Sequence, residues 1–213
     1  VNFIFKCGYI MISIDVIGDI FLDIYIIQEQ GEDIHKSEIY MFPGGSRLII
    51  AIGLAKRGYN VRLIGNVGND FVGDYLIKIL TRYGVDVDYV QRMDMRTPLF
   101  VNINEKPIAI DRQLLDCDVL LPNNKSDYLF ITTEISEEVI NRDLFSYYKK
   151  VFFDIGPRSK IISNNHKKYN NVLYIGNEKE CKELPFTCDV IKLGVNHPPP
   201  IEVGACRNTS SVD

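Results

Sequence analysis

Short apolar runs alternate with longer stretches of helical periodicity along most of the chain. The short runs are rich in β-branched and aromatic residues, a composition typical of buried strands. They predict strands at residues 12–17, 61–65, 128–132, 151–155, 172–175 and 190–193. The helical patterns predict helices over residues 46–57, 70–83, 136–149, 159–169 and 177–184. This alternation predicts a three-layer α/β/α sandwich in which helices cover a mostly parallel sheet.

Two stretches interrupt the alternation. Residues 24–43 and 98–111 contain β-forming residues broken by short polar segments, which is typical of hairpins that leave a main sheet. We expect them to form a small β lid on a single domain that spans residues 1–213. Their exposed strand edges favour pairing of two chains into a homodimer.

Composition restricts the class of protein. The chain has 213 residues, of which 46% are hydrophobic, so it can bury a sizeable core and is neither fibrous nor wholly disordered. Its formal net charge of −4 gives no overall attraction to nucleic acid or to an anionic membrane surface. No apolar run approaches the roughly 18 residues that span a bilayer. We therefore expect neither nucleic acid nor a membrane as a partner.

The cysteines and the first residues bear on the compartment. Five cysteines are scattered along the chain without a Cys-x-x-Cys pair, which predicts reduced thiols in a cytosolic protein. The first seventeen residues include Lys6 and Asp15 and lack a basic start, so we expect no secretory signal. Met11 directly precedes the first expected strand, and residues 1–10 are either native or an upstream extension. The expected location is cytoplasmic.

Two common nucleotide-binding motifs are absent from the sequence. The chain has no Gly-x-x-x-x-Gly-Lys-[Ser/Thr] loop. Its Gly-Asn-Val-Gly run at residues 65–68 lacks the Gly-x-Gly-x-x-Gly spacing that admits a dinucleotide pyrophosphate. The sequence therefore disfavours a redox enzyme of the Rossmann type.

A different glycine pattern marks the N-terminal half. A Gly-Gly pair at residues 44–45 opens the expected helix 46–57, and residues 65–73 follow with Gly-Asn-Val-Gly-Asn-Asp-Phe-Val-Gly. This order resembles the ribokinase-like (PfkB-type) carbohydrate kinases, in which a glycine pair opens a helix and a segment of the form liGxvGxDxxG follows. Three further segments resemble family motifs: a first strand ending in a substrate-binding Asp, a strand followed by D-x-x-x-R, and an N-x-x-E motif. They are residues 18–23, 154–158 and 177–180.

The resemblance implies ATP-dependent phosphorylation of a hydroxymethyl group on a sugar or nucleoside. It assigns Asp23, Gly44 and Gly45 to binding of the acceptor. We expect Asp23 at the carboxyl end of the first strand, where ligands of open α/β sheets collect and a carboxylate can accept hydrogen bonds from two hydroxyls. Two glycines at a helix start let backbone N–H groups approach a polar ligand closely.

The resemblance places the nucleotide and its Mg²⁺ ion near the C-terminal part of the chain. Asn177 and Glu180, three residues apart at the start of an expected helix, suit indirect binding of Mg²⁺, which keeps several water ligands. Gly194 lies in the segment that matches a nucleotide-contacting Thr-x-Gly-x-x-Gly motif, although Lys192 replaces the threonine.

The family's catalytic motif, Asp-Thr-x-Gly-Ala-Gly-Asp, has two possible counterparts. Residues 208–213 place Asp213 as the general base, with Ser211 and Val212 in place of glycines. The other alignment uses residues 204–206 and leaves Arg207 at the base position. We prefer the first, in which the chain ends at or just after the catalytic motif.

Ile49 also departs from the family, because it stands where a substrate-binding asparagine is usual. The acceptor therefore has one hydroxyl partner fewer, or a different one. The main hypothesis is an ATP-dependent sugar or nucleoside kinase. The alternative is a non-catalytic sugar- or nucleoside-binding relative that has lost the nucleotide half of its site.

Overall fold

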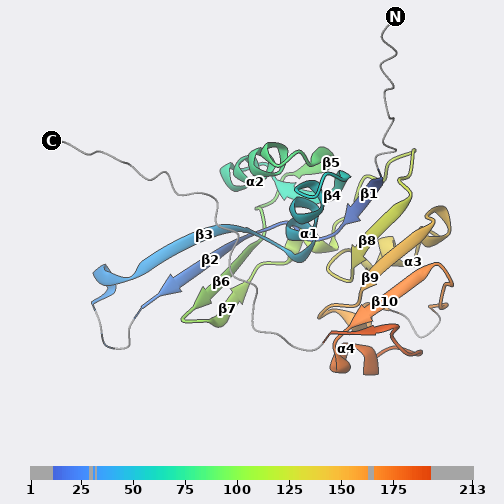
Figure 1. Cartoon of the computed structure of the whole chain (residues 1–213). Helices are drawn as coiled ribbons and strands as arrows, with labels where there is room; N and C mark the ends of the chain where they lie inside the picture. The colour runs from blue at the N-terminus through green and yellow to red at the C-terminus, as the bar shows by residue number, and fades with distance from the viewer. Residues whose placement is uncertain (1–11, 29–30, 32, 163–165, 193–213) are drawn as a thin grey trace, which may run out of the picture.

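The computed structural model describes residues 12–28, 31, 33–162 and 166–192 (Figure 1). A seven-stranded sheet forms its centre, in the order β11-β10-β9-β8-β1-β4-β5, and all neighbouring strands pair in parallel. Its strands are β1 (Ser13–Ile17), β4 (Asn60–Gly68), β5 (Asp86–Met93), β8 (Tyr128–Thr132), β9 (Lys150–Asp154), β10 (Val172–Gly176) and β11 (Val190–Ile191). The predicted α/β fold with a mostly parallel sheet is confirmed.

Helices pack on both faces of this sheet. They are α1 (Ser46–Ala55), α2 (Phe71–Arg82), α3 (Glu137–Asn141) and α4 (Glu178–Lys182). Successive side chains of β1 enter different cores, because neighbouring residues of a strand point to opposite faces. Val16 packs with Leu48 of α1 and Leu76 of α2, whereas Ile17 packs with Val139 of α3.

The two β-rich stretches form a second sheet that extends away from the first (Figure 1). Its strands are β2 (Phe21–Ile27), β3 (Glu38–Gly44), β6 (Leu99–Ile103) and β7 (Lys106–Ile110), in the order β3-β2-β6-β7. Each stretch is an antiparallel pair, and a parallel pairing of β2 with β6 joins them. The first stretch begins at Phe21, three residues before the expected start.

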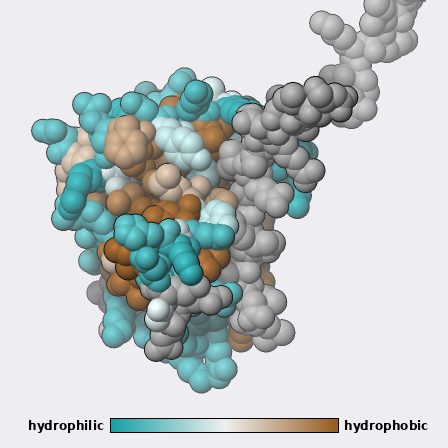
Figure 2. All heavy atoms as spheres, turned by 90° about the vertical axis from the view of Figure 1, so that its left-hand side faces the viewer, coloured by the Kyte–Doolittle hydropathy of each residue, from teal (hydrophilic) through white to brown (hydrophobic). Residues whose placement is uncertain are grey.

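Figure 2 looks onto the end of the molecule that carries this second sheet, where brown apolar residues gather among teal ones. Five of the large apolar side chains that the second sheet exposes are Ile27, Ile39, Met41, Ile108 and Ile110. Their relative exposure runs from 41% for Ile110 to 64% for Ile39. An exposed apolar strand surface of this kind is typical of an interaction site.

The helix predicted over residues 136–149 is wrong beyond Asn141. Arg142 adopts an extended conformation, and the chain then turns inward to bury Leu144 and Phe145. Asn171 donates hydrogen bonds from Nδ2 to the carbonyl oxygens of Phe145 (2.7 Å) and Tyr148 (2.9 Å). A side chain from the loop before β10 thus satisfies carbonyl groups that a longer helix would have paired with its own backbone.

The helix predicted over residues 159–169 is also wrong. Only a 3₁₀ turn, η4 (Ser159–Ile161), forms there, and residues 163–165 lie outside the described part. His166 and Tyr169 pack their rings near Tyr174 of β10, and the backbone N–H of Tyr169 donates to the Tyr174 hydroxyl at 3.3 Å. Aromatic packing against the sheet therefore replaces helix formation.

The prediction of reduced thiols is wrong for one pair of cysteines. Cys181 and Cys188 form a disulfide, with their Cα atoms 5.7 Å apart. The short helix α4 and the loop after it return the chain to the end of β10, which brings the two residues together. Cys117 has a free thiol, and Cys7 and Cys206 lie outside the described residues.

Within the part of the chain that the structure describes, no helix combines the length and the apolar character needed to cross a membrane.

Candidate functional site

The strand order of the main sheet reverses at its centre. β1 leads outward to β4 and β5 on one side, and β8 leads to β9, β10 and β11 on the other. At such a switch point the loops that follow the two central strands diverge, and open α/β sheets bind their ligands there. The loop after β1 carries Asp19, and the loop after β8 carries Glu134. Neither residue is among the site residues predicted from the sequence.

Asp19 is buried, and its side chain caps the N-terminus of helix α1 although it lies 27 residues before Ser46 in the sequence. Its carboxylate accepts hydrogen bonds from the backbone N–H of Ser46 (2.5 Å) and from the Ser46 hydroxyl (3.0 Å). Burial raises the pKa of Asp19, and the positive charge of Arg47 opposes that rise. The residue before Ser46 is Gly45, with φ of 90°, and a Cβ there would lie 2.7 Å from the Asp19 carbonyl oxygen. Glycine is therefore required for both the backbone conformation and the close approach.

Asp23 lies beside Gly44, but not where the sequence analysis expected it. The first strand ends at Ile17, so Asp23 belongs to β2 of the second sheet and not to the carboxyl end of β1. A Cβ on Gly44 would stand 1.9 Å from its Oδ1 atom, so the predicted acceptor-binding residues Asp23 and Gly44 are in direct contact. The carboxylate is half-buried and makes no hydrogen bond or ion pair with another described residue. Burial, together with the charge of Asp19, raises the pKa of Asp23 to about 6.

Arg47 connects this region with the strand that precedes the D-x-x-x-R motif. Its side chain is only 2% exposed, and its Nη2 atom lies 2.9 Å from Oδ2 of Asp154 at the end of β9. The other carboxylate oxygen of Asp154 lies 2.6 Å from Nζ of Lys192. Asp154 is thus held between two cations.

Glu134 lines a hollow beside the switch point. The lining residues are Gly18, Ile20, Gly65, Asn66, Leu114, Leu115, Cys117, Val119, Glu134 and Ile135. Asn66 Oδ1 and Glu134 Oε1 are buried and have no hydrogen-bond partner among the described residues. The Arg112 guanidinium lies 2.9 Å from Glu134 Oε1, but its orientation does not make a hydrogen bond.

Burial raises the pKa of Glu134 to about 7, and the charge of Asp19 adds to the rise while Arg112 opposes it. A carboxyl group with this pKa is partly protonated at neutral pH and can donate as well as accept a hydrogen bond. A sequence signal for it exists, because Thr-Thr-Glu directly follows a buried strand at the ligand-binding edge of the predicted sheet.

Asn177 and Glu180 cap helix α4 reciprocally. Oδ1 of Asn177 accepts from the backbone N–H of Glu180 (2.9 Å), and Oε2 of Glu180 accepts from the backbone N–H of Asn177 (2.8 Å). Nζ of Lys192 lies 3.4 Å from the same Glu180 oxygen. These contacts leave Glu180 Oε1 without a hydrogen bond to a described residue, so the pair fits a hydrated cation only through that one atom.

Two predicted site residues lie outside the described part of the chain: Asp213, the expected base, and Gly194. Among the residues that the structure does describe, no group of three or more His, Cys, Asp or Glu side chains could hold a metal ion directly. Of the predicted site residues, the structure brings together Asp23, Gly44 and Gly45. Asp19 lies between this group and Arg47.

Comparison with known proteins identifies relatives among sugar kinases. The ATP-dependent 6-phosphofructokinase of Thermoanaerobacterium thermosaccharolyticum is 29% identical over 120 residues, which are 56% of this chain and 37% of that enzyme. The 5-dehydro-2-deoxygluconokinase of Photobacterium profundum is also 29% identical over 120 residues, 56% of this chain and 34% of that protein. The chain spans about a third of the length of these relatives.

Solved structures share the fold. The ribokinase of Arabidopsis thaliana, solved with ribose and ATP, has a TM-score of 0.64 at 19% identity and covers 82% of this chain and 62% of its own. The nucleoside kinase of Methanocaldococcus jannaschii has a TM-score of 0.61 at 18% identity, with 81% and 62% covered.

The matched segment includes the elements that carry Asp19, Asp23, Gly44 and Gly45. A family model described as pfkB family carbohydrate kinase matches residues 11–118, about half of the chain. The chain belongs to the pfkB family of carbohydrate kinases.

Proposed function

We propose that this chain forms the acceptor-binding part of an ATP-dependent kinase that phosphorylates a hydroxyl group of a sugar or nucleoside. The observation that carries the proposal is the contact of Asp23 with Gly44 beside the switch point of the main sheet. The carboxylate has no partner among the described side chains, so it is available to two hydroxyl donors of an acceptor. Family membership supports phosphoryl transfer as the reaction.

The hollow next to Glu134 supports the approach of a hydroxyl group at the switch point. Asn66 Oδ1 is a buried oxygen without a hydrogen-bond donor among the described residues, and a buried acceptor of this kind costs free energy until a donor reaches it. A hydroxyl group of the acceptor supplies such a donor. The charge of Asp19 raises the pKa of both Asp23 and Glu134, so Asp19 lies close to each of them.

The phosphate donor is ATP with Mg²⁺, whose role is to neutralise charge on the γ-phosphoryl group during in-line transfer. Glu180 and Asn177 would hold the hydrated ion indirectly, and Gly194 would contact the nucleotide. Asp213 would accept the proton of the attacking hydroxyl as general base. The β-rich stretches of the second sheet, residues 24–43 and 98–111, would act as a lid that excludes water. Phosphoryl transfer to the sugar would then outcompete hydrolysis of ATP.

We further propose that the kinase is a cytoplasmic protein with residues 1–213 in one domain, and that it forms a homodimer through the lid strands. The apolar side chains that β3 and β7 expose support this pairing, since a second copy would remove them from water.

The test is a binding and activity screen. A panel of sugars and nucleosides is added to the chain in a thermal-shift assay, and the acceptor found is then assayed with MgATP by coupling ADP release to NADH oxidation. The Asp23→Asn variant should lower kcat/KM at least 100-fold while the fold is retained. Asp88→Asn, which changes an exposed carboxylate of β5, is the matched control and should leave kcat/KM unchanged. Equal kcat/KM in the two variants would refute the role of Asp23.

A second candidate is a protein that binds the acceptor without phosphorylating it. Ile49 favours it, as does the use of the Asn177 and Glu180 side chains in the cap of α4. Stabilisation by a sugar with none by MgATP, and no ADP release, would establish this second function.

A further inference from the structure

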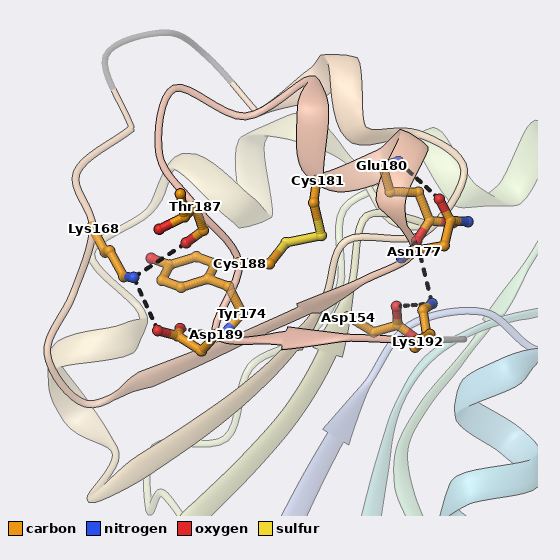
Figure 3. The surroundings of a disulfide bond; sticks show 10 residues. All are labelled: Asp154, Lys168, Tyr174, Asn177, Glu180, Cys181, Thr187, Cys188, Asp189 and Lys192. Atoms are coloured by element: carbon orange, nitrogen blue, oxygen red, sulfur yellow. Dashed lines mark hydrogen bonds and ion pairs between the residues drawn. A yellow bond between two sulfur atoms is a disulfide. The ribbon is translucent and has the colours of Figure 1, made fainter. Parts of the chain in front are cut away.

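The Cys181–Cys188 disulfide joins helix α4 to the segment that leads into β11 (Figure 3). Cys181 lies in α4, directly after Glu180, and Cys188 precedes β11, which is followed by Lys192. Nζ of Lys192 lies 3.4 Å from Oε2 of Glu180 and 2.6 Å from Oδ1 of Asp154, and Figure 3 shows the lysine side chain reaching both. The disulfide and the ion pairs therefore hold the same two elements together.

Few buried contacts hold the segment from β11 to Lys192, although Asp189 before it is anchored. Oδ2 of Asp189 accepts from the backbone N–H of Tyr174 (3.0 Å), and its Oδ1 lies 2.9 Å from Nζ of Lys168. β11 has two residues, both exposed, at the edge of the main sheet. On either side of it, the backbone N–H of Asp189 donates to Tyr174 (2.9 Å) and that of Lys192 donates to Gly176 (2.7 Å). A segment with so few buried contacts opens easily unless a cross-link restrains it.

Gly176 of β10 leaves room for the two sulfur atoms. A Cβ on Gly176 would stand 2.8 Å from Sγ of Cys181 and 3.4 Å from Sγ of Cys188, so the sulfur atoms pack directly on a glycine of β10. Both cysteines are partly exposed, which lets small thiols and disulfides reach them.

We propose that Cys181 and Cys188 are a site of reversible oxidation, whose disulfide holds β11 and Lys192 beside Glu180 and Asp154 and whose reduction releases them. The oxidant is a small-molecule disulfide of the glutathione type. One cysteine thiolate attacks this disulfide, forms a mixed disulfide and releases one thiol. The second cysteine thiolate then displaces the other thiol and closes the internal bond. The two cysteines thus lose two protons and two electrons, and the oxidant gains them as two thiols.

The consequence follows from how Lys192 is placed. In a reducing compartment such a pair is kept as thiols until the oxidant accumulates. Oxidation then fixes Lys192 against Asp154, whose other oxygen pairs with Arg47 of α1. The inference does not depend on kinase activity, since the thiol state and the opening of β11 can both be measured directly.

The experiment uses the full chain in a series of glutathione buffers, from fully reduced to fully oxidised. Free thiols are trapped with iodoacetamide, and peptide mass spectrometry reports the state of Cys181 and Cys188. Hydrogen exchange is measured in the two end buffers. We expect a reversible transition within the series, and amide exchange at Lys192 at least tenfold faster in the reduced form. Amides of β1 and β4 should change less than twofold.

Two variants serve as controls. Cys188→Ser prevents the bond and should show fast exchange at Lys192 in both end buffers. Cys117→Ser removes the free thiol at that position and should show the wild-type transition and exchange. The proposal is overturned if the pair remains open to iodoacetamide in the most oxidising buffer, or if it stays closed in the most reducing one. Equal exchange at Lys192 in the two wild-type states overturns it as well.

Discussion

The carboxylate of Asp23 lies where the side chain of any residue larger than glycine at position 44 would stand. A Cβ on Gly44 would approach Oδ1 of Asp23 to 1.9 Å and Oδ2 to 2.4 Å. The two residues lie on the paired strands β2 and β3, where Gly44 is the register partner of Phe21 and Asp23 that of Phe42. Gly44 therefore fixes the position in which the carboxylate is presented to a ligand.

Replacement of Gly44 by alanine should displace Asp23 without unfolding the chain. Because the clash is with a side chain that can rotate, we expect a loss of about 1–3 kcal/mol in the free energy of unfolding. The affinity for the acceptor should fall at least tenfold, as measured by isothermal titration calorimetry. Gly53→Ala is the control: the closest atom to its Cβ is Arg57 Nη1 at 3.6 Å, so this helix-interior change should stabilise by about 0.5–1 kcal/mol. An unchanged affinity in Gly44→Ala would contradict the proposed role of the contact.

Acceptor binding should depend on pH through Asp23. Burial and the neighbouring Asp19 raise the pKa of this carboxyl to about 6, so it takes up a proton as the pH falls below that value. The neutral form accepts hydrogen bonds less well than the carboxylate, and we expect acceptor affinity to decline from pH 7.5 to pH 5 with a midpoint near 6. Calorimetric titrations across this range measure it. Asp23→Asn should remove the midpoint, and a wild-type midpoint that survives in that variant would assign it to another group.

The sequence was informative where local signals and tertiary structure agree. The helix at 46–57, the strand at 61–65 and the helix at 70–83 appear with small shifts of their ends, because a glycine pair, an Asp70 cap and a terminal glycine mark them locally. The helices at 136–149 and 159–169 failed because long-range partners decide there: Asn171 bonds to one segment, and the Tyr174 ring packs with the other.

The candidate site was predicted in part for the same reason. Glycines with special backbone demands are visible in a sequence, so Gly44 and Gly45 could be singled out as candidates. Glu134 was missed because its importance comes from burial and from Asp19, which is 115 residues earlier in the chain. The disulfide was missed because a spacing of seven residues between Cys181 and Cys188 implies no bond until the turn after α4 is known.

Glu134→Gln should make the chain more stable at neutral and alkaline pH. The pKa of Glu134 is raised to about 7 in the folded chain from 4.5 for an ordinary glutamate, so the folded chain binds an extra proton between these values. The wild type should therefore lose stability as pH rises from 4.5 to 7, and one pKa unit corresponds to about 1.4 kcal/mol, which allows a loss of up to about 3 kcal/mol. Urea denaturation at pH 5 and pH 8 measures the difference between the two proteins.

Asp19 and Asp23 also have raised pKa values, so they too make the wild type less stable as the pH rises. The test is therefore the difference in stability between wild type and variant, and not the wild-type profile alone. Glu138→Gln, which neutralises an exposed carboxylate at the start of α3, controls for net charge. Parallel profiles of unfolding free energy against pH for the wild type and Glu134→Gln would contradict the prediction. They would show that ionisation of Glu134 does not destabilise the folded chain.

Arg47→Met should destabilise the chain more than its size suggests. The Arg47 side chain is 2% exposed, pairs with Asp154 and offsets the buried charge of Asp19. In the methionine variant, Asp154 keeps its ion pair with Lys192, but Asp19 has no neighbouring cation. Loss of one partner from a buried set of charges lowers the free energy of unfolding by about 3 kcal/mol. Because Asp19 can relieve this cost by taking up a proton, the loss should be larger at pH 8 than at pH 5.

Lys182→Met breaks an ion pair whose side chains are 73% and 74% exposed and should cost under about 0.5 kcal/mol at either pH. A loss for Arg47→Met as small as that of the surface control would mean that the charge of Asp19 is balanced by its hydrogen bonds to Ser46 and to the backbone N–H of residue 47.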